Sequence, residues 1–474
     1  MTERYDAVVV GSGPNGLGAA IELARHDLGV LVIEGSPVIG GGARTAELTV
    51  PGYRHDVCSS VHPFAAVSPF LSGLPLQEHG LTWLTPEVAV AHPFAGERGA
   101  MIAGTIEETT AGMGADADAY RGLMTWPVDH ADLLIDTILN PLLRIPRSPH
   151  KLVRLGLLAP VPMTRLARRF ATPEVRGLFA GLAGHTVMPL SRPLTGAMAV
   201  VMAMIAHHRG WPVAAGGSSA LVDAMAAHLR SLGGEIVTGW WVDSLDELPE
   251  AKAVVLDVAP AGLVRIAGDR LPPRFVHRME KWEYGPAVLK VDLALDGPIP
   301  WDYEPARRAS TVHLGGTLEE IAAGERAAWE GMADPNPYVI LTQPSVIDPG
   351  RAPAGGHSAW AYAHVPQGHA GDSAEPILRQ IERYAPGFRD IVVATHVAPP
   401  AHLELYNPNN VAGTIAGGAL TVGQTIGRPT WSLDPYTLPG DGLYLCSAAT
   451  PPGAGTHAMS GYHAATSALR RSFA

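Results

Sequence analysis

The chain has 474 residues, enough for roughly two or three domains with large cores, and 47% of its residues are apolar against 17% charged. This composition excludes a disordered chain and a small disulfide-rich scaffold. The formal net charge of −11 provides no basic field for phosphates, so no nucleic-acid partner is expected.

Two cysteines, Cys58 and Cys446, lie far apart without a CxxC motif. This spacing excludes the paired redox cysteines of a disulfide reductase and is typical of a reducing compartment. The first residues lack the basic region and cleavage site of a signal peptide, and no apolar run reaches the roughly 18 residues that span a bilayer. We therefore expect a cytoplasmic protein.

The first predicted unit is a strand at 7–10, a helix at about 14–25 and a second strand that ends at Glu34. The turn between strand and helix reads GSGPNG, a GxGxxG pattern. Its glycines let backbone amides approach a pyrophosphate, and an acid about 20 residues further on accepts from a ribose hydroxyl. These features predict a dinucleotide site that includes Gly11, Gly13, Pro14, Asn15, Gly16, Glu34 and Gly35. The alternative is a βαβ unit with an empty turn.

A second glycine cluster, GGGART at 40–45, follows this unit. Gly41, Gly42 and Ala43 would let the backbone approach the same pyrophosphate, and Arg44 would hold a positive charge beside it. This pattern favours non-covalently bound FAD over NAD. The alternative is a plain glycine-rich turn.

The rest of the chain alternates between two architectures. Apolar segments at 290–295, 338–342 and 358–365 look like strands without helices between them, which favours a mostly antiparallel sheet. After Gly216-Gly217, a predicted helix and strand follow each other as in the first strand–helix–strand unit. We therefore predict an α/β fold, α+β overall. A Rossmann-like FAD-binding domain (1–100, 210–285 and 420–474) is interleaved with a substrate domain of mostly antiparallel sheet plus helices (101–209 and 286–419).

Near the C-terminus, a strand at 441–447 leads into a glycine-rich turn and a helix of small residues. The backbone amides of such a turn and the positive end of its helix could contact a bound flavin. They suit its ribityl chain and the negative charge that a reduced flavin carries at its pyrimidine edge. The predicted cofactor contacts here are Ser447, Gly455, Thr456, His457, Ala458 and Met459.

Together these segments resemble the bacterial phytoene desaturase-like family of FAD-dependent oxidoreductases. The stretches YNPNN at 406–410, Gly417-Gly418 and Arg428-Pro429 are similar to family elements, and Val242 stands where the family holds the adenine. The terminal turn, PPGAGTH, departs from the HPGGG of many relatives. This departure leaves the substrate class open.

The resemblance implies hydride transfer between flavin N5 and a carbon of a small, largely apolar, unsaturated or oxidisable substrate. No second GxGxxG unit offers a nicotinamide domain, so a diffusible acceptor such as oxygen or a quinone is expected. The alternatives are a flavin-dependent double-bond isomerase or saturase, a flavin amine oxidase, and a non-catalytic lipid- or prenyl-binding protein.

Candidate catalytic groups are His457 in the terminal turn and His62, which follows a segment that passes the isoalloxazine ring in this superfamily. Ser59, Trp360 and Tyr362 are candidates for the substrate pocket, since the two aromatic side chains share one strand face. Structural histidines and ordinary sheet packing are the alternatives. His207-His208 lacks metal-ligand spacing, and no metal site is expected.

The segment from 137 to 173 contains seven basic residues and no acid, interleaved with apolar residues. Such a segment can contact an anionic membrane, so peripheral contact through 140–170 at the inner membrane face is a hypothesis. The alternative is a solvated basic face. Homo-oligomerisation is left open.

Overall fold

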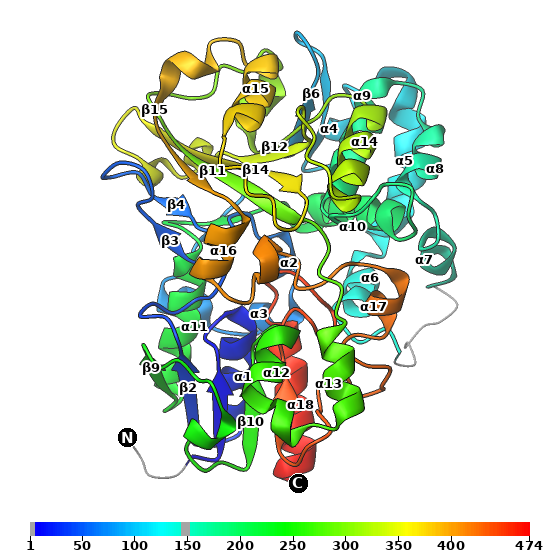
Figure 1. Ribbon diagram of the computed structural model, residues 1–474. Helices are drawn as coiled ribbons and strands as arrows, with labels where there is room; N and C mark the ends of the chain where they lie inside the picture. Colours follow the sequence, from blue (N-terminus) through cyan, green and yellow to red (C-terminus); the bar gives the residue numbers. More distant parts are fainter. Residues whose placement is uncertain (1–4, 144–151) are drawn as a thin grey trace.

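The computed structural model describes residues 5–143 and 152–474. It has a parallel sheet at one end and a larger mixed sheet at the other (Figure 1). The strand order of the parallel sheet is β16-β10-β1-β2-β9. Its strands are β1 (Ala7–Val10), β2 (Val30–Glu34), β9 (Glu235–Thr238), β10 (Ala253–Leu256) and β16 (Leu443–Leu445). The central strands are unbroken apolar runs because helices cover both faces of the sheet. The predicted Rossmann-like domain is confirmed.

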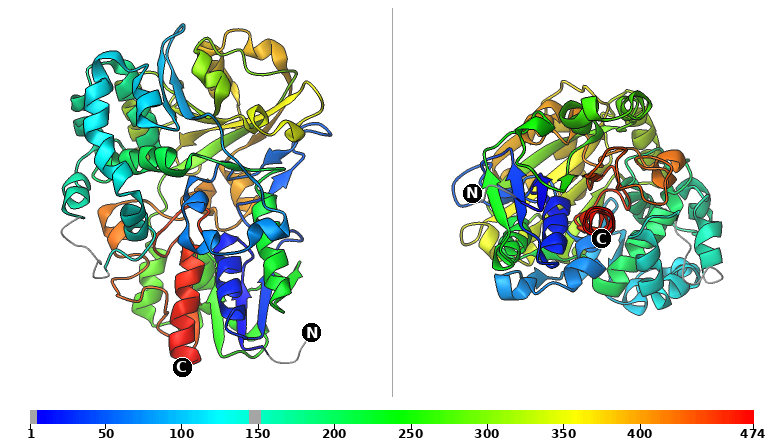
Figure 2. Two further views of the ribbon diagram at one scale, coloured as in Figure 1. Left: turned by 180° about the vertical axis from the view of Figure 1, so that it is seen from behind. Right: turned by 90° about the horizontal axis from the view of Figure 1, so that it is seen from below.

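Alternate residues of these strands pack into two cores. On one face they meet α1 (Pro14–Ala24), α11 (Ser219–Ser231) and α18 (Met459–Ser472), and on the other α12 (Pro260–Ala267) and α13 (Pro273–Glu280). Helices α1 and α18 lie side by side (Figure 2). Their close contact requires Gly461, because a Cβ there would lie 1.8 Å from the carbonyl oxygen of Asn15.

The second sheet has seven strands in the order β15-β11-β14-β13-β12-β6-β7. They are β15 (Val392–Ala398), β11 (Ala287–Leu295), β14 (His357–Val365), β13 (Val339–Thr342), β12 (Ala309–Leu314), β6 (Val88–Pro93) and β7 (Gly99–Ala103). All neighbours are antiparallel except β6 and β12, so the predicted sheet type is confirmed. Strand β6 belongs here although the predicted range 1–100 assigned it to the other domain. Its pairing with the distant β12 leaves no local signal in the sequence.

The two faces of this sheet differ in chemistry. One face is aliphatic and packs against α15 (Glu375–Tyr384). The opposite face carries polar and aromatic side chains of β11 and β14: Lys290, Asp292, Trp360, Tyr362 and His364. Helix α9 (Pro173–Gly184) packs against the β6–β12 end of this polar face. Glycines permit this packing, since a Cβ on Gly181 would lie 2.6 Å from the His313 ring.

The remaining helices form a lobe beside the mixed sheet or lie between the two sheets (Figure 1). The lobe contains α4 (Ile106–Thr110), α5 (Ala117–Asp129), α6 (Ala131–Ile138), α7 (Val153–Leu158), α8 (Met163–Leu166), α10 (Thr195–Arg209) and α14 (Leu318–Trp329). The connecting elements are β3 (Thr45–Ala46), β4 (His55–Asp56), α2 (Pro63–Ala66), α3 (Pro69–Ser72), β5 (Trp83–Leu84), β8 (Val213–Ala214), α16 (Pro400–Tyr406) and α17 (Val422–Ile426).

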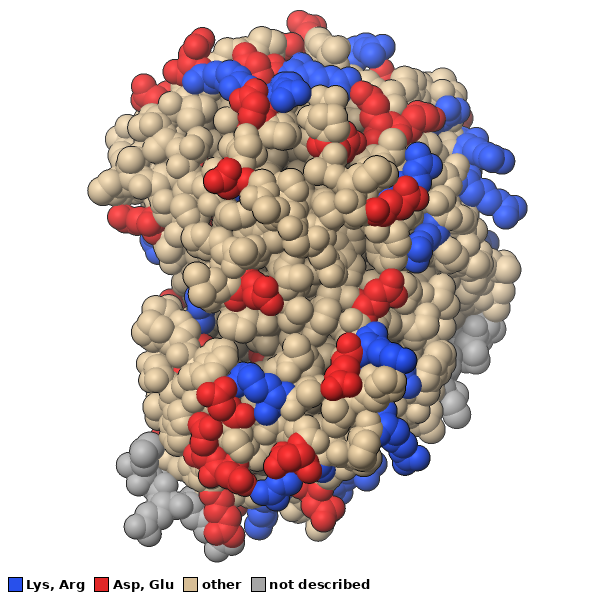
Figure 3. Space-filling view, viewed as in Figure 1, with Lys and Arg blue, Asp and Glu red and all other residues tan. Residues whose placement is uncertain are grey.

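The surface does not test the membrane hypothesis. In Figure 3, charged side chains of both signs gather at the two ends of the molecule and are sparser between them. Three basic residues of the predicted contact, Arg144, Arg147 and Lys151, lie outside the described residues. Next to them, α7 exposes Val153 and Leu157. Among the described residues, no helix is long and apolar enough to cross a bilayer. Membrane contact through 140–170 stays a prediction.

Candidate functional site

The turn between β1 and α1 has the shape that its glycines allow. Gly11 has a φ of +104°, and a Cβ on Gly16 would lie 2.0 Å from the carbonyl oxygen of Gly11. Helix α1 has Gly13 as its N-cap and Pro14 in its first turn, so the N-cap residue has no side chain to cap the helix, and the backbone N of Gly16 donates to the Asp257 carboxylate at 2.8 Å. The amide oxygen of Asn15 is buried and has no partner. An anionic ligand at this turn would meet the positive end of α1.

Glu34 ends β2 and accepts hydrogen bonds from this turn. Its Oε2 accepts from the backbone N of Ser12 at 3.0 Å and from the Ser12 hydroxyl at 2.6 Å. Its Oε1 accepts from the backbone N of Ser36 at 2.9 Å and lies 3.5 Å from a nitrogen of Arg44. A carboxylate has about four acceptor positions. Each oxygen already accepts two hydrogen bonds, so a ribose hydroxyl would replace the longest of them, the 3.5 Å contact with Arg44.

The predicted adenine side lies beyond Glu34. A Cβ on Gly35 would lie 2.5 Å from the ring of Trp241, so the indole packs on the backbone here. The side chain of Val242 is in the core, and its carbonyl oxygen accepts from Arg265 at 2.9 Å. The adenine role of Val242 stays a prediction.

The second glycine cluster folds onto the first turn. The backbone N of Gly40 donates to the carbonyl oxygen of Ser12 at 3.1 Å, and a Cβ on Gly41 would lie 3.2 Å from the Cα of Gly13. Ala43 is buried and Arg44 lies over the ring of Tyr406 at 5.3 Å. The Tyr406 hydroxyl is buried without a partner. A cation and an unpaired hydroxyl thus meet beside the two glycine turns.

The terminal turn reaches the same region from the other end of the chain. The Thr456 hydroxyl lies 3.4 Å from that of Ser59, and the Ser68 hydroxyl donates to the carbonyl oxygen of His457 at 2.7 Å. Ser447 is buried and its hydroxyl accepts from the Ala449 backbone N at 3.2 Å. Gly455 has a φ of +135°, Ala458 is the N-cap of α18, and Met459 begins that helix. The predicted cofactor residues of all three segments are therefore close in space.

Both candidate histidines are buried and neutral. Nε2 of His457 donates to the carbonyl oxygen of Gly453 at 3.2 Å, while its Nδ1 accepts from the backbone N of Met459 at 3.1 Å. Nε2 of His62 lies 3.0 Å from the Ser218 hydroxyl, and its Nδ1 has no partner. Burial lowers the pKa of each ring to about 4. Such rings are weak proton acceptors at neutral pH, so their catalytic roles stay predictions.

The glycine turns meet the polar face of the mixed sheet at Cys58 and Lys290. A Cβ on Gly42 would lie 3.8 Å from Cys58. Burial raises the pKa of the Cys58 thiol, and the positive charge of Lys290 acts against that rise. Lys290 is 3% exposed, forms an ion pair with Asp292, and lies 5.0 Å from the centre of the Trp360 ring. Trp360 in turn stacks on Tyr362 at 5.5 Å.

Several buried polar atoms on this face have no hydrogen-bond partner. They are the hydroxyls of Thr311 and Thr342 and ring nitrogens of His92, His313, Trp360 and His364. The register places Thr311, Thr342 and Trp360 in one row across the sheet, next to Asp292. Because buried polar groups are nearly always paired, this row marks a place for a polar ligand or for ordered water.

Four groups of this site were not predicted from the sequence as site residues: Asp257, Lys290, Tyr406 and Arg428. Asp257 directly follows β10 and accepts from the backbone N of Gly16 at 2.8 Å. Its position at the carboxyl end of a parallel strand is where ligands bind in such sheets, and that signal could have identified it. Tyr406 and Arg428 lie in stretches that resemble family elements, whereas Lys290 has no comparable local signal.

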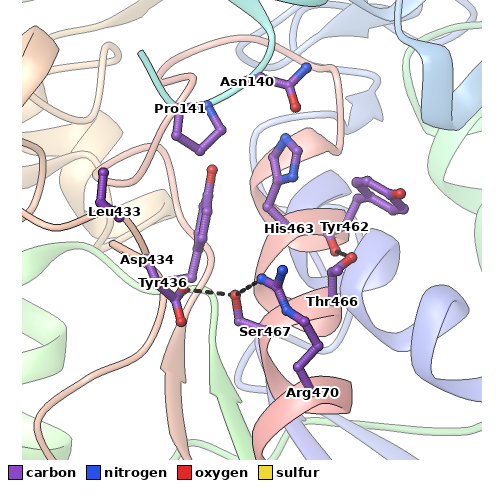
Figure 4. A pocket seen from close by; sticks show the side chains of 10 residues that line it. All are labelled: Asn140, Pro141, Leu433, Asp434, Tyr436, Tyr462, His463, Thr466, Ser467 and Arg470. Atoms are coloured by element: carbon purple, nitrogen blue, oxygen red, sulfur yellow. Dashed lines mark hydrogen bonds between the residues drawn. The ribbon is translucent and has the colours of Figure 1, made fainter. Parts of the chain in front are cut away.

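A separate surface cavity of about 220 Å³ lies beside α18 (Figure 4). Its lining includes Tyr436, His463 and Arg470, and Ser467 donates to Asp434 at 2.8 Å. None of the predicted site residues lines it. We therefore do not assign it to the site.

This geometry is that of the flavin-type oxidoreductase fold, and comparisons with known proteins agree. Residues 9–72 match the family of NAD(P)-binding Rossmann-like domains. The chain is 27% identical to the mouse protein named pyridine nucleotide-disulfide oxidoreductase domain-containing protein 2, over 98% of this chain and 93% of that protein. Both cysteines of this chain are unpaired.

Solved structures show the same fold over the whole length. An oxidoreductase from Methanosarcina mazei has a TM-score of 0.66 and 15% identity over 98% of this chain and 99% of that one. A putrescine oxidase has a TM-score of 0.62 and 18% identity over 99% of both chains. The more specific resemblance to phytoene desaturases stays a prediction.

Glu34→Gln is expected to weaken FAD binding about ten- to hundredfold, because an amide replaces one acceptor oxygen with a donor that faces the Ser12 donors. Titration of the apoprotein with FAD, followed by flavin fluorescence, measures this change. Glu250→Gln, at an exposed position in the same domain, is the matched control. Equal affinity in the two variants would contradict the assigned role of Glu34.

Proposed function

We propose that this protein is an FAD-dependent oxidoreductase that moves a hydride between a substrate carbon and the flavin. One observation carries the proposal: three glycine-rich segments from distant parts of the chain lie close to one another. Unpaired buried atoms of Asn15 and Tyr406 at these segments fit a large polar cofactor.

FAD, when bound, supplies a two-electron acceptor for hydride. The amides of α1 and the Arg44 guanidinium would bind its diphosphate, and Glu34 its ribose. Lys290, buried and paired with Asp292, would hold or transfer a proton at the substrate. The nearby rings of Trp360 and Tyr362 would orient the substrate and exclude water.

The polar face favours a substrate with hydrogen-bonding groups over the largely apolar one expected from the resemblance. The unpaired atoms of Thr311, Thr342 and Trp360 would remain unsatisfied against a bare hydrocarbon, at about 1–3 kcal/mol each. Oxidation of a protonated amine is disfavoured beside Trp360, because the Lys290 cation already lies over that ring. A diffusible acceptor such as oxygen or a quinone would reoxidise the flavin.

The visible spectrum of the purified protein under anaerobic conditions, before and after NADH or NADPH, tests this proposal. We expect a flavin band that persists with the nicotinamides and bleaches with a hydroxyl- or carbonyl-bearing substrate. Bleaching by nicotinamides would instead favour a reductase or a reductively activated isomerase. No band after reconstitution with FAD would favour a binding protein.

Lys290→Met is expected to keep its FAD and to slow flavin reduction by the substrate about a hundredfold or more, because it removes the proton-transferring group. Stopped-flow measurement of flavin absorbance follows this step. Lys290→Arg keeps a positive charge in the pair with Asp292. A folded Lys290→Arg variant with slow flavin reduction would show that the loss is one of chemistry and not of folding. Lys252→Met, at an exposed position, is the control. An unchanged rate in Lys290→Met would exclude Lys290 from the chemistry.

A further inference from the structure

Arg428 is a buried arginine in the loop that follows α17. It is 1% exposed. Its Nε donates to the carbonyl oxygen of Gln424 at 3.1 Å and its Nη1 to that of Ala448 at 2.8 Å. Its Nη2 is buried and has no partner. The guanidinium thus has an unused donor inside the protein.

No carboxylate among residues 5–143 and 152–474 forms an ion pair with Arg428. Two carbonyl oxygens and the ring of Trp282, 5.9 Å away, are its polar and aromatic surroundings. Burial lowers the pKa of its guanidinium to about 10. A buried charge without a counter-charge is strongly unfavourable. By contrast, the buried Arg351 has the carboxylates of both Asp56 and Asp348.

The unpaired charge lies against the terminal glycine turn. A Cβ on Gly453 would lie 2.7 Å from Nη1 of Arg428. The carbonyl oxygen of Gly453 accepts from His457, whose Nδ1 in turn accepts from the first backbone N of α18. The guanidinium and the positive end of this helix are therefore connected through one short turn.

We propose that Arg428 provides the counter-charge for the pyrimidine edge of the flavin, where negative charge collects when the flavin is reduced. This inference rests on the proposed function, since it requires FAD in the site. A fixed charge at that edge stabilises the reduced form of the cofactor. The competing explanation is structural: Arg428 would only hold the carbonyl groups of Gln424 and Ala448.

Sulfite distinguishes the two explanations. It forms a bond to N5 of oxidised flavin, and the resulting negative charge resides on the pyrimidine ring, so its affinity reports positive charge at that edge. We expect Arg428→Gln to retain FAD and to bind sulfite at least about tenfold more weakly than wild type. The sulfite affinity of Arg428→Lys should stay within about threefold of the wild-type value. Lysine keeps the charge but lacks the forked donors for two carbonyl groups.

Arg278→Gln is the matched control. Arg278 donates to the carbonyl oxygen of Gly427 at 2.9 Å but is partly exposed, so its sulfite affinity should equal that of wild type. Unchanged sulfite affinity in Arg428→Gln would overturn the inference. Equal loss of folding in the Gln and Lys variants would also overturn it, because Arg428 would then only hold the two carbonyl groups. Loss of FAD with normal sulfite affinity in the remaining holoprotein would assign Arg428 to the diphosphate and also overturn it. Wild-type protein that takes up no FAD would refute the proposed function itself.

Discussion

Gly16→Ala should abolish FAD retention. The added Cβ would lie 2.0 Å from the carbonyl oxygen of Gly11, a backbone atom that cannot rotate away, so the turn would have to open. Opening moves the first amides of α1 away from the diphosphate. We expect FAD affinity to fall at least about a hundredfold, the loss of two or more hydrogen bonds to a charged ligand.

Bound FAD per chain, measured after gel filtration, tests this result, and circular dichroism checks that the variant is folded. Gly13→Ala gives a graded comparison, since its Cβ would meet the Asp257 side chain, which can move, at 2.9 Å. Gly122→Ala in α5 is the control, because its Cβ would have no neighbour within 4 Å. Full FAD occupancy in folded Gly16→Ala would place the cofactor elsewhere.

Asp257→Asn should make the protein more stable above neutral pH. Burial, with a smaller effect from the Glu34 charge, raises the pKa of Asp257 to about 7, while the hydrogen bond from Gly16 opposes this rise. A carboxyl group with a raised pKa stabilises the fold below its unfolded value of 3.8, and this stability is lost as the pH rises through about 7. The variant does not titrate and avoids that loss.

A shift of this size would correspond to about 4 kcal/mol in a fully buried group. Because Asp257 is partly exposed, we expect a gain in the free energy of unfolding of about 2 kcal/mol at pH 8, and less at pH 5. Urea unfolding of the apoprotein at both pH values measures it. An equal difference at pH 5 and pH 8 would show that Asp257 does not titrate in this range.

The same carboxyl affects cofactor binding. A diphosphate near Gly13 and Gly16 would be repelled by ionised Asp257, whose Oδ2 accepts from the Gly16 backbone N. FAD affinity of the wild type should therefore fall from pH 7 to pH 9, by up to about tenfold per pH unit, and that of Asp257→Asn should not. Identical pH profiles would place the diphosphate away from this group.

The elements predicted from the sequence share one property: their signals are local. The apolar run of β1, the GxGxxG turn and Glu34 lie within 35 residues, and the structure contains the predicted strand, helix and strand. The alternation of Trp360 and Tyr362 with alanines likewise predicted a strand, which is β14. Hydrophobic periodicity and turn-forming residues depend on near neighbours in the chain, so the sequence alone predicts the elements that they form.

The assignment of β6 to the first domain was wrong because strand pairing acts over long distances. Nothing near residues 88–93 indicates that they pair with β12. The polar face of the mixed sheet was predicted only in part, from Trp360 and Tyr362, for the same reason. Lys290, Thr311, Thr342 and Trp360 are on four strands, and only the register brings them together.

The sequence by itself determined the Rossmann-like class, the glycine turns and the nature of the second sheet, since each depends on residue spacing within one segment. Only the tertiary structure decided which charges these turns meet. Asp257 accepts from Gly16, Lys290 pairs with Asp292, and Arg428 lies against Gly453 without a carboxylate partner. Those contacts depend on how distant strands and helices pack, and burial then sets the electrostatics of each group.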